Sequence, residues 1–302
     1  MTQDIALLVN PTAGKGNGAR LVQPVVARLQ AGGASVHVIT GRDADEGFDL
    51  ARDRVAAGVD GLVAVGGDGL VNLALQVVAG TEVPLGVIPA GTGNDIARAM
   101  DLPLDDPLAA ADVVTAGRLR AVDVGRAAGR WFAGVLSSGF DSMVNERANR
   151  MTWPRGRARY NVAMLAELRT FRPVPFTIEL DGVPWQTDAM LVAVGNGSSY
   201  GGGMRVCPGA SLEDGLFDVT VLGPISKPEF IRVFPRVYKG THVDHPAVTV
   251  RRARVVSLAA AGVTAYADGE RVGNLPVTAE VVPGGLRVFA RAVSGPPAAP
   301  AP

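Results

Sequence analysis

Short apolar runs alternate with amphipathic stretches from the start of the chain to about residue 125. Four runs predict buried strands, over residues 5–10, 34–40, 60–67 and 84–91. The stretches that follow them predict helices over residues 18–31, from Asp45, over 69–79 and from near Asn94. Near-continuous apolar strands separated by helices are typical of a parallel sheet covered on both faces. This pattern predicts an α/β domain that binds ligands where its strands end.

The pattern changes near Leu119, where strand-like segments become dominant. Nine such segments are predicted, over residues 119–127, 130–138, 174–182, 188–196, 216–223, 247–258, 263–270, 275–282 and 286–293. Turn residues such as Asp181-Gly182 and Pro283–Gly285 separate several of them. Helices are expected near 140–150, 157–171 and 226–238. We therefore expect a second, mainly antiparallel domain, followed by a disordered Pro/Ala-rich end over residues 294–302.

Composition narrows the class of protein. A length of 302 residues suits two domains, and the balance of 29 basic against 29 acidic residues argues against a dedicated nucleic-acid binder. The single cysteine, Cys207, allows no intrachain disulfide and fits a reducing compartment. Neither a signal peptide nor an apolar run of about 20 residues is present, so an enzyme with a lipid substrate would reach the membrane from the cytosol.

Three glycine-rich segments fall where predicted strands end: Asn10–Gly16, Gly66–Gly69 and Gly91–Asp95. Glycines let the backbone approach a phosphate, and a following helix adds positive potential. One such segment is commonly only a tight turn, but three on one sheet edge favour phosphate binding. The Walker A and Rossmann spacings are both absent.

Two acids lie inside these glycine segments. Asp68 and Asp95 would repel a bound phosphate unless a Mg²⁺ ion lay between them. The alternatives are a turn or helix-capping role for Asp68 and a helix N-terminal role for Asp95.

These motifs, in this order and spacing, resemble the diacylglycerol kinase catalytic family, which includes bacterial diacylglycerol kinases, sphingosine kinases and ceramide kinases. The resemblance extends from Ile5 to about Arg291. It implies a doubly wound α/β domain like that of phosphofructokinase and NAD kinase, followed by a mainly antiparallel β-sandwich domain. We expect the first domain over residues 1–123, joined by the segment 287–302, and the lipid-substrate domain over 124–286.

The resemblance also implies roles for individual residues. Those expected to line the nucleotide are Asn10, Pro11, Thr12, Ala13, Gly14, Thr40, Gly66, Gly67, Asp68, Gly69, Leu70, Val71, Asn72 and Thr92. Asp68, Asp95 and Asp123 resemble an acid trio that organises Mg²⁺ and its waters. The family usually has Thr where this chain has Leu70, so we expect altered nucleotide affinity.

The second domain carries two further matches. Glu270, in Ala267–Glu270, resembles the family's catalytic base, although Asp268-Gly269 is also a hairpin-turn pair. Ser211, Asp214 and the carbonyl of Leu216 resemble a structural Mg²⁺ loop of bacterial members, and the alternative is an ordinary turn.

Five arginines lie between Arg147 and Arg159, together with Met151 and Trp153. Basic residues beside a tryptophan suit an anionic membrane surface, although a solvated helix and loop would have the same pattern.

The sequence predicts a cytoplasmic, peripherally membrane-associated kinase that uses ATP and Mg²⁺ to phosphorylate a lipid hydroxyl. Diacylglycerol is the expected acceptor, which would yield phosphatidic acid. Another lipid or sphingoid acceptor, NAD, or a non-catalytic nucleotide-binding regulator remains an alternative. The expected partner is a lipid at the membrane surface and not a nucleic acid, and a homodimer stays open.

Overall fold

The computed structural model describes residues 3–10, 13–154 and 157–291. Its first lobe contains β1 (Gln3–Val9), α1 (Ala13–Ala31), β2 (Ala34–Ile39), α2 (Ala44–Ala56), β3 (Gly61–Gly66), α3 (Asp68–Val78), β4 (Leu85–Pro89), α4 (Asp95–Ala99) and α5 (Pro107–Thr115). Strands β2, β1, β3 and β4 form a parallel sheet in that order. Among the helices of this lobe, α1 contacts α5 and α2 contacts α3. The predicted N-terminal α/β domain is therefore confirmed.

The second lobe is built mainly of strands. It contains β5 (Leu119–Ala127), β6 (Arg130–Phe132), β7 (Val135–Gly139), α6 (Phe140–Arg150), α7 (Arg157–Thr170), β8 (Val174–Leu180), β9 (Val183–Ala189), β10 (Leu191–Gly195), β11 (Phe217–Leu222), α8 (Lys227–Val233), β12 (Val248–Ala253), β13 (Val255–Ala259), β14 (Thr264–Ala267), β15 (Glu270–Asn274) and β16 (Val277–Phe289). Two short 3₁₀ turns, Phe234–Lys239 and Thr241–Asp244, follow α8.

Two sheets face each other in this lobe. One is the six-stranded antiparallel sheet β12-β11-β10-β7-β14-β15, and the other contains β16, β13, β8 and β9. Their facing side chains form one buried cluster, which includes Ile178 and Val256 from one sheet and Val194 and Phe217 from the other. The predicted antiparallel second domain is therefore confirmed.

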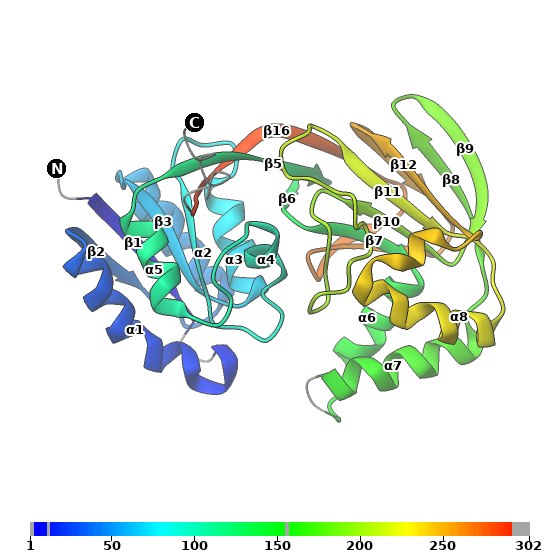
Figure 1. The fold of residues 1–302 in the computed structure, drawn as a ribbon, viewed down its shortest axis with the longest axis horizontal. Helices are drawn as coiled ribbons and strands as arrows, with labels where there is room; N and C mark the ends of the chain where they lie inside the picture. Colours follow the sequence, from blue (N-terminus) through cyan, green and yellow to red (C-terminus); the bar gives the residue numbers. More distant parts are fainter. Residues whose placement is uncertain (1–2, 11–12, 155–156, 292–302) are drawn as a thin grey trace, which may run out of the picture.

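Strand β16 connects the two lobes. It pairs with β13 at one end and with β4 at the other, so the parallel strands and part of the sandwich form a single ten-stranded sheet. Figure 1 shows β16 running beside β5 from one lobe to the other. Leu286 and Phe289 belong to the core of the first lobe, while Val277 and Ala279 belong to that of the second. The predicted domain boundaries stay a prediction, and residues 292–302 lie outside the described residues.

The structure corrects four predicted elements. The predicted strand over 130–138 is divided into β6 and β7, which belong to different sheets. Within residues 275–291 there are not two strands around a turn, because Gly284 adopts a φ of 62° within a bulge and β16 continues through it. The predicted strand over 247–258 is divided into β12 and β13, which belong to different sheets. The predicted helix over 226–238 ends as α8 at Val233 and continues as a 3₁₀ turn that has Pro235 in its first turn.

Candidate active site

Two of the glycine-rich turns pack directly against each other at the carboxyl edge of the parallel sheet. Gly67 precedes α3 and Gly91 follows β4. A Cβ atom on Gly91 would lie 2.5 Å from the Cα atom of Gly67, which is closer than any side chain could come. Glycine at both positions therefore lets the β3–α3 and β4–α4 connections bring their acids together.

Asp68 is the first residue of α3, and its carboxylate lies beside Gly93. A Cβ atom on Gly93 would lie 2.7 Å from Asp68 Oδ2 and 3.5 Å from Asp95 Oδ2, so both carboxylates flank this glycine. Asp68 Oδ1 accepts a hydrogen bond from the Ile96 backbone N–H at 3.1 Å. Burial raises the pKa of Asp68, and repulsion from Asp95 raises it further. A cation between the two acids would relieve this repulsion.

Asp95 begins α4 and connects the two lobes. Its carboxylate accepts hydrogen bonds from the backbone N–H groups of Gly202 and Gly203, at 2.6 and 2.8 Å, and pairs with Arg98 at 3.2 Å. Gly202 and Gly203 belong to the second lobe, in the connection between β10 and β11. Asp95 is thus positioned by groups from both lobes.

Asp268 is an acid whose importance the sequence did not reveal. It occupies the turn of the β14–β15 hairpin with a φ of 50°. Its carboxylate accepts backbone N–H bonds from Ala133, Gly134 and Val135 at 2.8, 2.9 and 3.1 Å. Burial raises the pKa of Asp268 to about 6, against the lowering effect of these three hydrogen bonds, and the nearby Asp68 raises it slightly more. An Asp-Gly pair predicts a hairpin turn but not which distant N–H groups the aspartate accepts.

Glu270 follows this turn and is exposed at the start of β15. Its Oε1 atom lies 4.0 Å from the position that a Cβ would take on Gly69. Glu270 also lines a cleft together with Asn10, Gly69 and Leu70 of the first lobe. A carboxylate of the second lobe therefore faces the first turn of α3, beside Asp68.

The residues predicted to line the nucleotide fall into several groups. Asn10, Gly69 and Leu70 line the cleft that contains Glu270, and Thr92 lines the neighbouring acidic cleft with Asp68 and Asp95. Gly66 ends β3, while Val71 and Asn72 are buried in α3. Thr40 directly follows β2, and Ala13 and Gly14 begin α1. Pro11 and Thr12 lie outside the described residues.

Asp123 is not among the described residues that line these two clefts. It is buried on β5, where its carboxylate accepts N–H bonds from Gly215 at 2.7 Å and Gly284 at 2.8 Å. It therefore anchors the loop that contains Ser211, Asp214 and Leu216. Its predicted part in organising Mg²⁺ and its waters stays a prediction.

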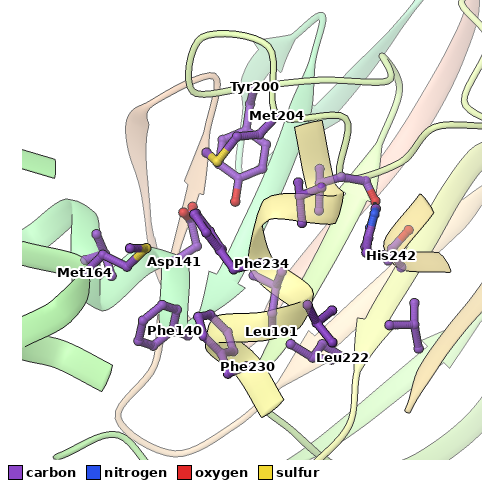
Figure 2. Close-up of a pocket in the computed structure, with 16 residues that line it drawn as sticks. Phe140, Asp141, Met164, Leu191, Tyr200, Met204, Leu222, Phe230, Phe234 and His242 are labelled. Atoms are coloured by element: carbon purple, nitrogen blue, oxygen red, sulfur yellow. The ribbon is translucent and has the colours of Figure 1, made fainter. Parts of the chain in front are cut away.

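The second lobe also contains an apolar pocket that the sequence did not indicate. Figure 2 shows Phe140 and Phe230 on one side of this pocket and Tyr200 and Met204 on the opposite side. Its walls come from α6, α7, α8 and strands β10 and β11, so residues far apart in the chain meet there. Tyr200 lines both this apolar pocket and the acidic cleft.

A further contact joins the apolar pocket to the acidic cleft. The Asn145 side chain lines the acidic cleft and donates to Asp141 Oδ2 of the apolar pocket at 3.5 Å. A polar, acid-lined cleft thus adjoins a pocket lined mainly by aliphatic and aromatic side chains.

Two family models match consecutive parts of the chain. Residues 4–127 match the model of the diacylglycerol kinase catalytic domain, and residues 134–290 match that of the YegS C-terminal NAD kinase beta sandwich-like domain. The diacylglycerol kinase of Mycobacterium tuberculosis strain H37Rv is 44% identical over 94% of each chain. The diacylglycerol kinase of Bacillus subtilis strain 168 is 30% identical over 89% of this chain and 90% of the relative.

Solved structures show the same fold. A diacylglycerol kinase of Bacillus anthracis strain Sterne has a TM-score of 0.74 at 22% identity, covering 96% of this chain and 97% of that one. An NAD kinase of Archaeoglobus fulgidus, solved in complex with ATP, has a TM-score of 0.52 at 14% identity, covering 96% of this chain and 93% of that one.

The two lobes have the fold of the NAD kinase structure, and residues of both lobes line the acidic cleft. Among proteins with this fold, the 44% identity over nearly the whole chain is decisive. The chain belongs to the diacylglycerol kinase catalytic family, and it is a lipid kinase.

Proposed function

We propose that this kinase transfers the γ-phosphoryl group of ATP, with Mg²⁺, to the free hydroxyl of diacylglycerol and so forms phosphatidic acid. The observation that carries the proposal is that two dissimilar cavities adjoin each other. An acidic cleft suited to a metal–phosphate group and an apolar pocket suited to an acyl chain share Tyr200 as a lining residue. The relatives that bear the name diacylglycerol kinase support this choice of acceptor.

The glycine-rich turns would hold the triphosphate, since their backbone N–H groups lie at the starts of α3 and α4. Among the described residues, no group of three or more His, Cys, Asp or Glu side chains is arranged to hold a metal. Mg²⁺ in kinases nevertheless needs only one or two protein carboxylates, because phosphate oxygens and water complete its shell. Asp68 and Asp95 fit that requirement, and Mg²⁺ bound there would neutralise charge on the transferring phosphoryl group.

Glu270 would accept the proton of the lipid hydroxyl as its oxygen attacks the γ-phosphorus, while the bond to the β-phosphate oxygen breaks and ADP leaves. Asp268 would position this base. Its three hydrogen bonds to Ala133, Gly134 and Val135 tie the hairpin that carries Glu270 to the start of β7.

The acceptor would enter from a membrane. Helices α6 and α7, which contribute Phe140, Val144 and Met164 to the apolar pocket, also carry exposed apolar side chains such as Leu165. Trp153, in the connection between these helices, is 81% exposed. Among the described helices, none is both long and apolar enough to cross a bilayer. We propose that this surface makes a peripheral contact with anionic lipid through Trp153 and the arginines around it.

The test is phosphatidic acid formation from ATP in diacylglycerol micelles. The Glu270→Gln variant should lose about 10²–10⁴-fold in kcat, because the hydroxyl then lacks a proton acceptor. Glu280→Gln, at an exposed position on β16, is the matched control and should keep the wild-type rate. A wild-type kcat in Glu270→Gln would show that Glu270 is not the base that accepts the proton. Absence of any lipid-dependent turnover in the wild type would overturn the proposed function.

A further inference from the structure

The loop over residues 211–216 leads into β11 and lies beside β12 of the six-stranded sheet. In this sheet Asp218 of β11 and Arg252 of β12 are direct cross-strand partners. The resemblance to bacterial relatives assigns this loop a structural Mg²⁺ ion, bound by Ser211, Asp214 and Leu216. Whether the residues present can accept such an ion depends on what already contacts them.

The Arg252 guanidinium lies between two carboxylates. Its Nε atom donates to Asp218 Oδ1 at 3.1 Å, and its Nη2 atom donates to Asp214 Oδ2. A planar guanidinium can donate in two directions at once, so a single cation bridges both acids. Asp214 is the only carboxylate in the predicted ligand set, and its charge is therefore already compensated.

Two of the other ligand atoms, on the side chains of Asp214 and Ser211, also accept hydrogen bonds within the loop. Asp214 Oδ1 accepts from the Leu216 backbone N–H at 3.1 Å, and Ser211 Oγ accepts from the Glu213 backbone N–H at 3.3 Å. These contacts give the loop the arrangement of a closed turn, in which the one ligand carboxylate is already paired with Arg252.

Displacing the guanidinium would carry a large cost. The Asp218 side chain is only 6% exposed, whereas the Asp214 side chain is 31% exposed. An incoming Mg²⁺ ion at Asp214 would push Arg252 away and leave the buried Asp218 carboxylate without its counter-ion. Breaking such a buried pair is strongly unfavourable, because the remaining charge is neither solvated nor compensated.

We infer that in this chain the Arg252 guanidinium takes the place of the structural Mg²⁺ ion, and that the loop over residues 211–216 is held by an ion pair without a metal. The loop is also fixed on its inner side, where the Gly215 N–H donates to Asp123.

The test compares thermal unfolding in EDTA and in millimolar MgCl₂, without nucleotide, for the wild type, Asp214→Asn and Arg252→Gln. Any Mg²⁺-induced rise in Tm of the wild type should persist unchanged in Asp214→Asn, because the loop holds no ion. Arg252→Gln should lose about 5 °C in EDTA and regain part of it in MgCl₂, as the freed carboxylates acquire a cation. Arg254→Gln, on the exposed link between β12 and β13, is the matched control and should change neither value.

Two outcomes would overturn the inference. One is a Mg²⁺-dependent rise in the Tm of the wild type that Asp214→Asn abolishes. The other is an Arg252→Gln variant as stable in EDTA as the wild type. If Arg252→Gln does not fold, Mn²⁺ bound per chain is counted by electron paramagnetic resonance for the wild type and Asp214→Asn. Equal numbers support the ion pair, and one fewer Mn²⁺ in Asp214→Asn refutes it.

Discussion

At the scale of single residues, two aspartates with the same local sequence have different surroundings. Asp181 and Asp268 both precede glycine in a hairpin turn, with φ values of 50°. Each accepts backbone N–H bonds from a neighbouring segment, Asp181 from Arg254 and Val255, and Asp268 from Ala133 to Val135. Asp181 is exposed, whereas the Asp268 carboxylate is enclosed beside Asp68 in the acidic cleft. The sequence predicted both turns, but burial is a property of the assembled lobes.

This difference predicts a pH dependence of stability. The folded pKa of Asp268, about 6, is above its ordinary value of 3.8. The folded state therefore binds more protons than the unfolded state within this window, so Asp268 makes the protein less stable as pH rises from about 4 to about 6. When Tm is measured across this range, the Tm of Asp268→Asn relative to that of the wild type should increase as the pH rises. Asp181→Asn is the control and should follow the wild type, and parallel curves for Asp268→Asn and wild type would contradict the assignment.

At the scale of elements, the sequence predicted the first lobe better than the second. Buried parallel strands such as β3 have continuous apolar runs, and the helices between them have clear amphipathic patterns. The continuity of β16 was not predictable, because Pro283–Gly285 has the composition of a turn. What keeps the strand continuous is a long-range bond, from the Gly284 N–H to the buried Asp123. Local sequence does not encode such a partner.

The apolar pocket was hidden from the sequence for a related reason. Its lining residues, such as Phe140, Leu191, Leu222 and Phe230, are individually indistinguishable from core residues. Only the packing of α6, α7 and α8 over β10 and β11 shows that they enclose a space. The acids were easier to predict, because glycine-rich turns at strand ends are a local signal.

The pocket leads to a prediction about lipid recognition. Met164 of α7 lines it, while the next residue, Leu165, is 59% exposed on the same helix. Met164→Trp should fill part of the space that an acyl chain would occupy and raise KM for long-chain diacylglycerol by about tenfold, which corresponds to a loss of about 1.4 kcal/mol in binding. KM for ATP should not change. Leu165→Trp, with the same substitution on the outer side of the helix, should leave the lipid KM in micelles unchanged. Equal effects of both variants would show that the pocket does not hold the acyl chain.

At the scale of the whole molecule, the proposed chemistry requires both lobes. Asp68 and Asp95 come from the first lobe and Glu270 from the second. Hydrogen bonds cross between the lobes, from the N–H groups of Gly202 and Gly203 to Asp95. The acids that would organise metal and phosphate thus also fix the position of the lobe that would bring the lipid. A change in the relative position of the lobes would alter the metal site and the acceptor site together.

The same arrangement predicts how the molecule meets its substrate. Trp153 is exposed in the connection between α6 and α7, and Leu165 is exposed on α7, the helix that contributes Met164 to the apolar pocket. Arg150, the last residue of α6, has a side chain that is 82% exposed. Replacing Trp153 and Leu165 together by alanine should weaken binding to anionic vesicles about tenfold or more, since both apolar side chains would be buried in the lipid. Added salt should weaken the wild type as well, through screening of the arginines. Val183→Ala, at another exposed apolar position, on β9, is the control.

Activity toward water-soluble short-chain diacylglycerol should be preserved in the double variant, because the apolar pocket and the acidic cleft are intact. Wild-type vesicle binding by the double variant, or equal wild-type binding to neutral and anionic vesicles, would place the membrane contact elsewhere on the molecule.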